Sequence, residues 1–192
     1  MYSKVSRQSV QRVMVRYART KFAIRQSILI NLIKKPGTFG VVSAYTADTP
    51  KSRNQKQHGS IIGDIQRMGY RKVYTITGQW QQKKEESLLI HSMKADDVFA
   101  LGKKHKQDAV IYKGKDGVIG MYYFAGYAEI ATTPTAEAAF QLSQGKDLYS
   151  KDRNWSFEFG FLWGQHIPWD SRTPFTKKDV ERFIANGQLV FE

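Results

Sequence analysis

Lysine and arginine give this sequence its most obvious chemistry, which is attraction for anionic groups. Among 192 residues, 30 are Lys or Arg and 17 are Asp or Glu, so the formal net charge is +13 at pH 7. Nine of the basic residues precede Asp48, the first acidic residue of the chain. A positive field of this size concentrates phosphate-bearing partners near the protein. The composition therefore predicts a surface that contacts a polyanion, which would be nucleic acid or an acidic protein surface.

Three segments supply candidates for that contact. Residues 5–19 have the periodicity of an amphipathic helix, with arginines every three to four residues on the side opposite the apolar ones. Residues 47–60 read as a basic polar loop after a buried strand, where binding residues often lie, and Asn54 could orient a ligand by paired hydrogen bonds. A further basic pair opens the next predicted strand. The candidate cations are Arg12, Arg16, Arg19, Arg53, Lys56, Arg71 and Lys72.

The carboxylates suggest an alternative chemistry. Glu86 or Asp48 could serve as a general base or metal ligand while Arg53 holds phosphate, as in a metal-dependent nuclease, and Asp64 is a further possible ligand. The ligand spacing is not diagnostic, and the sequence contains no HExxH, GxSxG, GxGxxG or P-loop pattern. The chain has no cysteine, which excludes disulfides and thiolate chemistry. We therefore assign no metal and no cofactor.

The elements that must position these residues are a mixture of strands and helices. The expected order is a strand at 38–46, a helix at 60–68 closed by Gly69, a strand at 71–77, a polar loop at 78–85, a strand at 87–92, a helix at 94–104, and strands at 109–112 and 118–124. This mixture predicts an α+β fold, with a mostly antiparallel sheet and flanking helices. A basic N-terminal helix and an aromatic-rich C-terminal extension complete it.

We place a domain boundary after residue 131, with a basic core domain at 1–131 and an extension at 132–192 that packs on the core. The extension begins with a predicted short helix at 135–142. Aromatic residues then alternate from Trp155 to Trp163, which predicts one strand with five rings on one face. That face would be core or a protein interface, a base-stacking surface, or the wall of a small-molecule pocket. Thr176 should cap a last helix at 177–185, and residues 188–191 could add an edge strand.

An ordered set of short motifs runs from residue 17 to residue 113. The motifs are Tyr17-x-x-Thr20-x-Phe22, the strand Phe39–Tyr45, Ser52-Arg53-Asn54, Glu85-Glu86-Ser87 and the strand that follows Gln107. In order and spacing they resemble a family of uncharacterised bacterial and phage domains. The resemblance implies that Asn54, Glu86 and Gln107 are polar positions of the pattern. They would converge on one binding site from three strand ends, or else satisfy buried loop backbone.

These observations favour a non-catalytic basic binding protein, a phage-encoded accessory factor that contacts nucleic acid or an acidic host protein. The metal-dependent enzyme is one alternative, and a virion structural or assembly protein with the aromatic strand as its interface is another. No apolar run approaches the roughly 20 residues of a membrane span, and the N-terminus lacks the apolar core of a signal peptide. We therefore expect a protein of the bacterial cytoplasm or of the virion, without a membrane partner.

Overall fold

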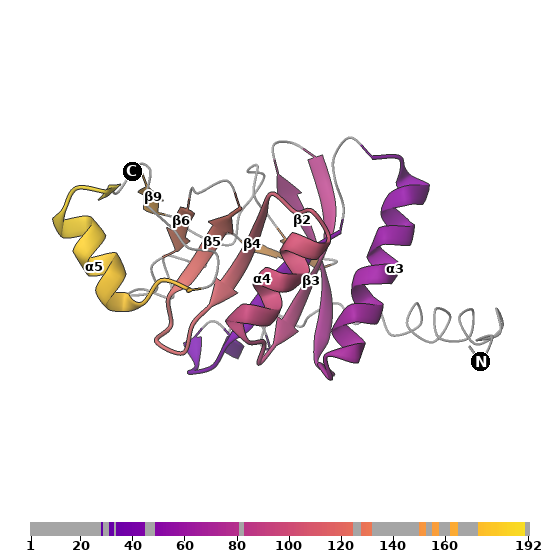
Figure 1. The fold of residues 1–192 in the computed structure, drawn as a ribbon, viewed down its shortest axis with the longest axis horizontal. Coiled ribbons are helices and arrows are strands. Elements are labelled where there is room, and N and C mark those ends of the chain that lie inside the picture. Colours follow the sequence, from indigo (N-terminus) through magenta and orange to yellow (C-terminus); the bar gives the residue numbers. More distant parts are fainter. Residues whose placement is uncertain are drawn as a thin grey trace.

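The fold is an eight-stranded antiparallel sheet with helices packed against it (Figure 1). A computed structural model describes residues 28, 31–32, 34–44, 49–80, 83–124, 128–131, 150–152, 155–157, 162–164 and 173–190. The helices are α3 (Lys51–Arg67), α4 (Ala95–Lys104) and α5 (Lys177–Ala185). The strands are β1 (Phe39–Ser43), β2 (Val73–Trp80), β3 (Lys83–His91), β4 (Ala109–Lys113), β5 (Ile119–Tyr123), β6 (Ala128–Ala131), β7 (Ser150–Asp152), β8 (Trp155–Phe157), β9 (Leu162–Gly164) and β10 (Leu189–Val190).

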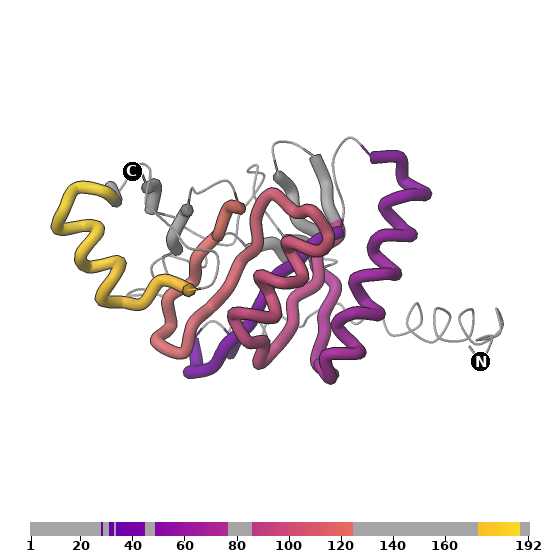
Figure 2. Tube along the Cα trace, viewed as in Figure 1, coloured from indigo at the N-terminus to yellow at the C-terminus, as the bar shows by residue number. Residues whose placement is uncertain are grey.

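The first six elements form one recognisable unit within the sheet. The sheet order is β10-β9-β6-β5-β4-β1-β3-β2, and each neighbouring pair is antiparallel. The chain order β1-α3-β2-β3-α4-β4 with β1 and β3 in the middle is the ferredoxin-like, or split β-α-β, arrangement. Strands β5, β6, β9 and β10 extend the sheet beyond β4. The trace in Figure 2 shows α3 beside the β2–β3 end and α5 at the opposite end.

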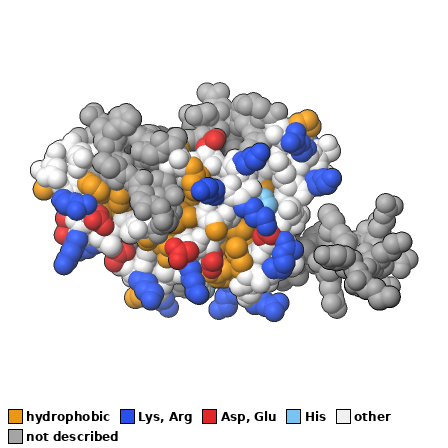
Figure 3. Space-filling view, in the orientation of Figure 1, with side chains coloured by type: hydrophobic (Ala, Val, Ile, Leu, Met, Phe, Trp, Pro, Cys, Tyr) orange, Lys and Arg blue, Asp and Glu red, His pale blue; other side chains and the backbone are white. Residues whose placement is uncertain are grey.

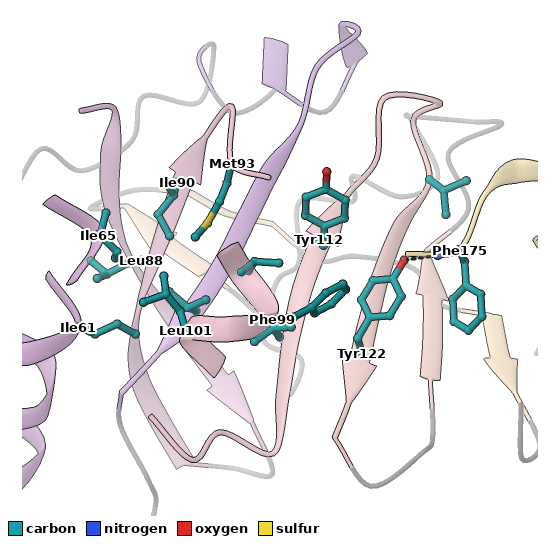
Figure 4. Close-up of a cluster of buried hydrophobic side chains, with 14 of the residues drawn as sticks. Ile61, Ile65, Leu88, Ile90, Met93, Phe99, Leu101, Tyr112, Tyr122 and Phe175 are labelled. Carbon is teal, nitrogen blue, oxygen red and sulfur yellow. Dashed lines mark hydrogen bonds between the residues drawn. The ribbon is translucent and has the colours of Figure 1, made fainter. Parts of the chain in front are cut away.

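The first face of the sheet carries the core beneath the helices. Val42 pairs with Leu88, and both side chains pack with Ile61 and Ile65 of α3 and Leu101 of α4 (Figure 4). The aromatic part of this core continues toward α5. Tyr122 meets Phe99 edge to face at 5.3 Å and stacks on Phe175 at 5.4 Å between ring centroids. Its hydroxyl accepts a hydrogen bond from the Phe175 N–H at 3.0 Å. This bond joins β5 to the segment that leads into α5.

The centre of the second face of the sheet is also buried. Phe39, Leu89 and Ile119 alternate with the first-face residues along their strands, and all three are fully buried. Lys113 lies on this face as well, only 1% exposed, and burial lowers the pKa of its ammonium. Its Nζ donates at 2.7 Å to the carbonyls of Leu32 and Lys35, at the end of a helical segment. A cation at a helix C-terminus interacts favourably with the helix dipole, so Lys113 fastens this segment to the sheet.

The predicted fold class is confirmed, and so are several element ends. Gly69 follows α3 with a φ of 86°, and the Tyr70 N–H closes the helix by donating to the Ile65 carbonyl. Thr176 caps α5 in a reciprocal capping box with Asp179. Helix α4 and strands β4 and β5 lie within a residue of their expected bounds.

Three local predictions are wrong. The basic segment 51–59 is not a loop, because it forms the first turns of α3. The predicted polar loop at 78–85 is instead the hairpin of β2 and β3, whose pairing runs to Trp80 with Lys83. The aromatic segment Trp155–Trp163 is not one strand, since β8 pairs with β7 in a separate two-stranded sheet while β9 joins the main sheet.

Other predictions concern segments that the structure does not describe. The helix at 5–19 and the helix at 135–142 lie outside the described residues. Strands on both sides of the proposed domain boundary share the main sheet, and the boundary itself stays a prediction. No helix among the described residues is long and apolar enough to cross a membrane.

Candidate functional site

Helix α3 presents a line of cations to solvent. Arg53, Lys56 and Arg67 are exposed, and their spacings of three and eleven residues place them close together around the helix axis. Arg53 and Arg67 are fourteen residues apart, which is about four turns and roughly 21 Å along the axis. The only carboxylate of α3 is Asp64, which is buried at 4% exposure. The outer side of α3 therefore carries positive charge without a neutralising acid from its own helix (Figure 3).

Asp64 is the centre of a charged cluster between α3 and α4, which we call the Asp64 cluster. Its Oδ1 accepts from Lys104 Nζ at 2.7 Å and from Arg67 Nη2, and its Oδ2 lies 2.8 Å from His105 Nε2. The His105 side chain is only 8% exposed, whereas Arg67 and Lys104 are 71% and 59% exposed. A buried carboxylate thus holds two solvent-facing cations and one buried imidazole.

The cluster changes the protonation of Asp64. Burial alone raises the pKa of a carboxyl group, but the hydrogen bonds from Lys104, His105 and Arg67 favour the charged form more strongly. The result is a pKa lowered from 3.8 to about 2. Asp64 is therefore ionised throughout the physiological range and cannot act as a proton donor there.

A second tie joins the segment just beyond α3 to the first turn of α4. The Tyr70 hydroxyl, just beyond α3, donates to Asp97 Oδ2 at 2.5 Å and accepts from the Lys94 N–H at 3.0 Å. Burial, followed by the hydrogen bond to Asp97, raises the pKa of Tyr70 to about 12. The two helices are thus fixed relative to each other at two points.

The predicted polar trio lies at one end of the sheet. Asn54 is buried on the inner side of α3 and donates to the Thr49 carbonyl at 3.2 Å. Glu86 is half-buried on β3, where its carbonyl accepts from Ser43 Oγ at the end of β1. Gln107 precedes β4, whose first residues lie at this same end because β1 and β4 are antiparallel. The topology therefore brings the three to the same end of the neighbouring strands β4, β1 and β3.

Near that end of the strands, two amide oxygens have no hydrogen-bond partner in the described structure. Gln57 Oε1, one turn after Asn54, and Gln107 Oε1 are both buried without a hydrogen bond. Unsatisfied buried acceptors are uncommon and costly. Asn54 therefore bonds loop backbone, whereas the amide oxygen of Gln107 leaves buried acceptor capacity unused.

The remaining predicted cations divide into two groups. Arg71 and Lys72 are exposed in the segment that joins α3 to β2, at the end of α3 remote from Asn54. They add two exposed cations beyond the last turn of α3. Arg12, Arg16 and Arg19 lie outside the described residues, as does Asp48.

Sequence reasoning missed the Asp64 cluster. One signal was present, because Asp64 falls on the same helical spacing as Ile61 and Ile65 and so had to face inward. An acid on a buried stripe requires a cationic partner. Its partners Lys104 and His105 are forty residues away, and nothing local in the sequence identifies them.

The part of the chain described contains no cluster of ligands that would support the metal-dependent alternative. No three His, Asp or Glu side chains there are placed to hold a metal ion. Asp64 in particular is surrounded by cations, which oppose the binding of another one.

Residues 45–110 match a family model described as "Protein of unknown function (DUF3293)". The matched stretch begins just after β1 and runs through α3, β2, β3 and α4 to the start of β4. It supports the expected similarity to an uncharacterised domain family. No curated protein matches the chain.

Proposed function

We propose that this protein binds nucleic acid through the outer side of α3 and the segment that leads from α3 to β2. The contacts would be Arg53 and Lys56 on the first two turns and Arg71 and Lys72 beyond the last turn. The observation that carries the proposal is the absence of any exposed acid on α3, whose one carboxylate is buried and already paired. Phosphates attract such an array without requiring a particular base sequence.

The burial of Phe39 and Leu89 at the centre of the second sheet face supports the helical side as the contact surface. Many RNA-binding modules with this topology stack bases on aromatic side chains of the open sheet face. Here Phe39 and Leu89 on that face are fully buried, so they are not available for stacking. A polyanion would instead meet the exposed helices.

The test is a salt-dependent binding measurement with a fluorescent oligonucleotide, both single-stranded and duplex. Affinity should fall by orders of magnitude between about 50 mM and about 200 mM salt, because each neutralised phosphate releases counterions. Arg53→Gln and Lys56→Gln should each reduce the slope of log affinity against log salt by about 1. Lys178→Gln, which removes an exposed cation of α5 at the other end of the sheet, is the matched control and should leave the slope nearly unchanged.

Two results would overturn the proposal. One is binding that is absent or insensitive to salt. The other is an equal loss for Lys178→Gln, which would mean attraction to net charge without a defined surface. Capture of an acidic protein that survives nuclease treatment would redirect the same cations to a protein partner. The phage origin, the accessory role, and the enzyme and virion alternatives stay predictions.

A further inference from the structure

The Asp64 cluster carries more positive charge than its carboxylate neutralises. Asp64 supplies one negative charge, while Arg67 and Lys104 supply two positive ones before His105 is counted. Both cations bond the same oxygen, Oδ1, so their nitrogens lie no more than roughly 6 Å apart. Two like charges held this close repel each other, and a second anion on their outer side would relieve that repulsion.

Solvent-facing donors remain on both cations. A guanidinium has five N–H groups and an ammonium has three, and the contacts with Asp64 use only part of them. The high exposure of Arg67 and Lys104 turns the rest toward solvent. Lys104 and His105 already fasten α4 to Asp64, whereas Arg67 belongs to the same helix as Asp64, so fastening α3 to α4 does not account for Arg67 on the same oxygen.

We propose that Arg67 and Lys104 together bind one phosphate group, with Asp64 as the positioning residue beneath them. The inference rests on the proposed function for the source of that phosphate, which is the nucleic-acid backbone. Phosphate oxygens accept charge-assisted hydrogen bonds from two cations at this separation. The ties at Tyr70 and at Asp64 hold α3 and α4 in place, so the two donors are arranged before the ligand arrives.

A double-mutant cycle on oligonucleotide affinity tests the shared phosphate. Arg67→Gln and Lys104→Gln should each weaken binding by about tenfold, the loss of one charge-assisted hydrogen bond. Because both cations bind one phosphate, the two losses should not multiply. The affinity loss of the double variant should be smaller than the product of the two single losses by a factor of at least about three. Lys103→Gln removes the neighbouring exposed cation of α4, and its loss should simply multiply with that of Arg67→Gln. Losses that multiply equally in both pairs would overturn the proposal.

Asp64→Asn tests the positioning role by the sign of its effect. The substitution makes the protein more positive, so attraction to net charge alone predicts tighter binding. Positioning predicts weaker binding, because the two cations lose the carboxylate that holds them together. Tighter binding by a folded Asp64→Asn variant would refute the role of Asp64, and a melting curve for each variant establishes that it is folded. The cycle above uses exposed residues and so does not depend on this variant.

Inorganic phosphate separates this inference from the proposed function. Titration of the full chain with phosphate, followed by NMR of the arginine side-chain resonances, should shift the Arg67 signal, and Lys104→Gln should abolish that shift. Phosphate binding without oligonucleotide binding would retain the site and reject the nucleic-acid function. Oligonucleotide binding with an additive cycle and no phosphate-induced shift would do the reverse. Failure of both ligands to bind would reject both.

Discussion

Asp64→Asn should lower stability in a manner that depends on pH. In the folded protein the pKa of Asp64 is about 2, against 3.8 for the free group, because three donors stabilise the carboxylate against the opposing effect of burial. The unfolded chain therefore takes up the proton first as the pH falls. The stabilisation by this group is complete above about pH 4 and is lost as the pH falls through the folded-state value near 2.

The size of the effect follows from that difference in pKa. At roughly 1.4 kcal/mol for each pKa unit, the fall from 3.8 to about 2 corresponds to about 2 kcal/mol of folding free energy at pH 7. By linkage, roughly half of it should be lost by about pH 3. Every other carboxylate is present in both proteins, so the difference between wild type and Asp64→Asn isolates this one group.

Urea unfolding followed by tryptophan fluorescence measures the difference at several pH values. The free energy of unfolding of the wild type should exceed that of Asp64→Asn by about 2 kcal/mol or more at pH 7, and the gap should narrow by about 1 kcal/mol near pH 3. Asp96→Asn, which removes an exposed carboxylate of α4, controls for effects common to any lost acid. A gap that stays constant from pH 7 to pH 3 would refute the inferred ion pairing of Asp64.

Three further substitutions test how the core and the helices are held. Gly102→Ala should destabilise the protein by about 1–3 kcal/mol in chemical denaturation, although alanine has the better helix propensity, because its Cβ would lie 2.5 Å from Val110 Cγ1. An unchanged stability would show that the contact relaxes. Tyr122→Phe should cost about 1–3 kcal/mol, since the buried Phe175 N–H loses its acceptor, and a near-neutral result would contradict that bond. Lys113→Met should speed amide hydrogen exchange near residues 34–38 more than in α4, because the carbonyls of Leu32 and Lys35 lose their shared donor. Equal exchange in both regions would argue against that anchor.

The helices with local signals were predictable, whereas the first half of α3 was not. Thr176 and Gly187 mark the ends of α5, because capping residues of these types can be recognised from the local sequence alone. In α3 the inward positions of the first two turns are Asn54, Gln57 and His58, so no apolar periodicity marks the helix. The polar composition of the segment after Pro50 therefore predicts a loop. Packing of the later turns, through Ile61 and Ile65, holds the polar turns in helical form.

The site was predictable in charge and not in arrangement. Composition identified Arg53, Lys56, Arg71 and Lys72 as exposed cations, and the structure places them along α3 and its exit. The pairing of Asp64 with residues of α4 depends on how two helices cross the sheet, which is set by strand order. That order places β3 between β1 and β2, and no short-range pattern specifies it.

The family match covers the part of the chain that carries the candidate cations. Residues 45–110 contain α3, α4 and the hairpin between them, and hence both the line of cations and the Asp64 cluster. Helix α5 and strands β5 to β10 lie outside that stretch. Within the matched unit, α3 and α4 bury their inner sides on the sheet, and Leu89 on the opposite sheet face is buried as well. Among the exposed surfaces described in this unit, α3 carries cations without an exposed acid, whereas α4 carries Asp96 and Asp97 as well as Lys103 and Lys104. Under the proposed function, a polyanion would therefore meet this unit along the outer side of α3.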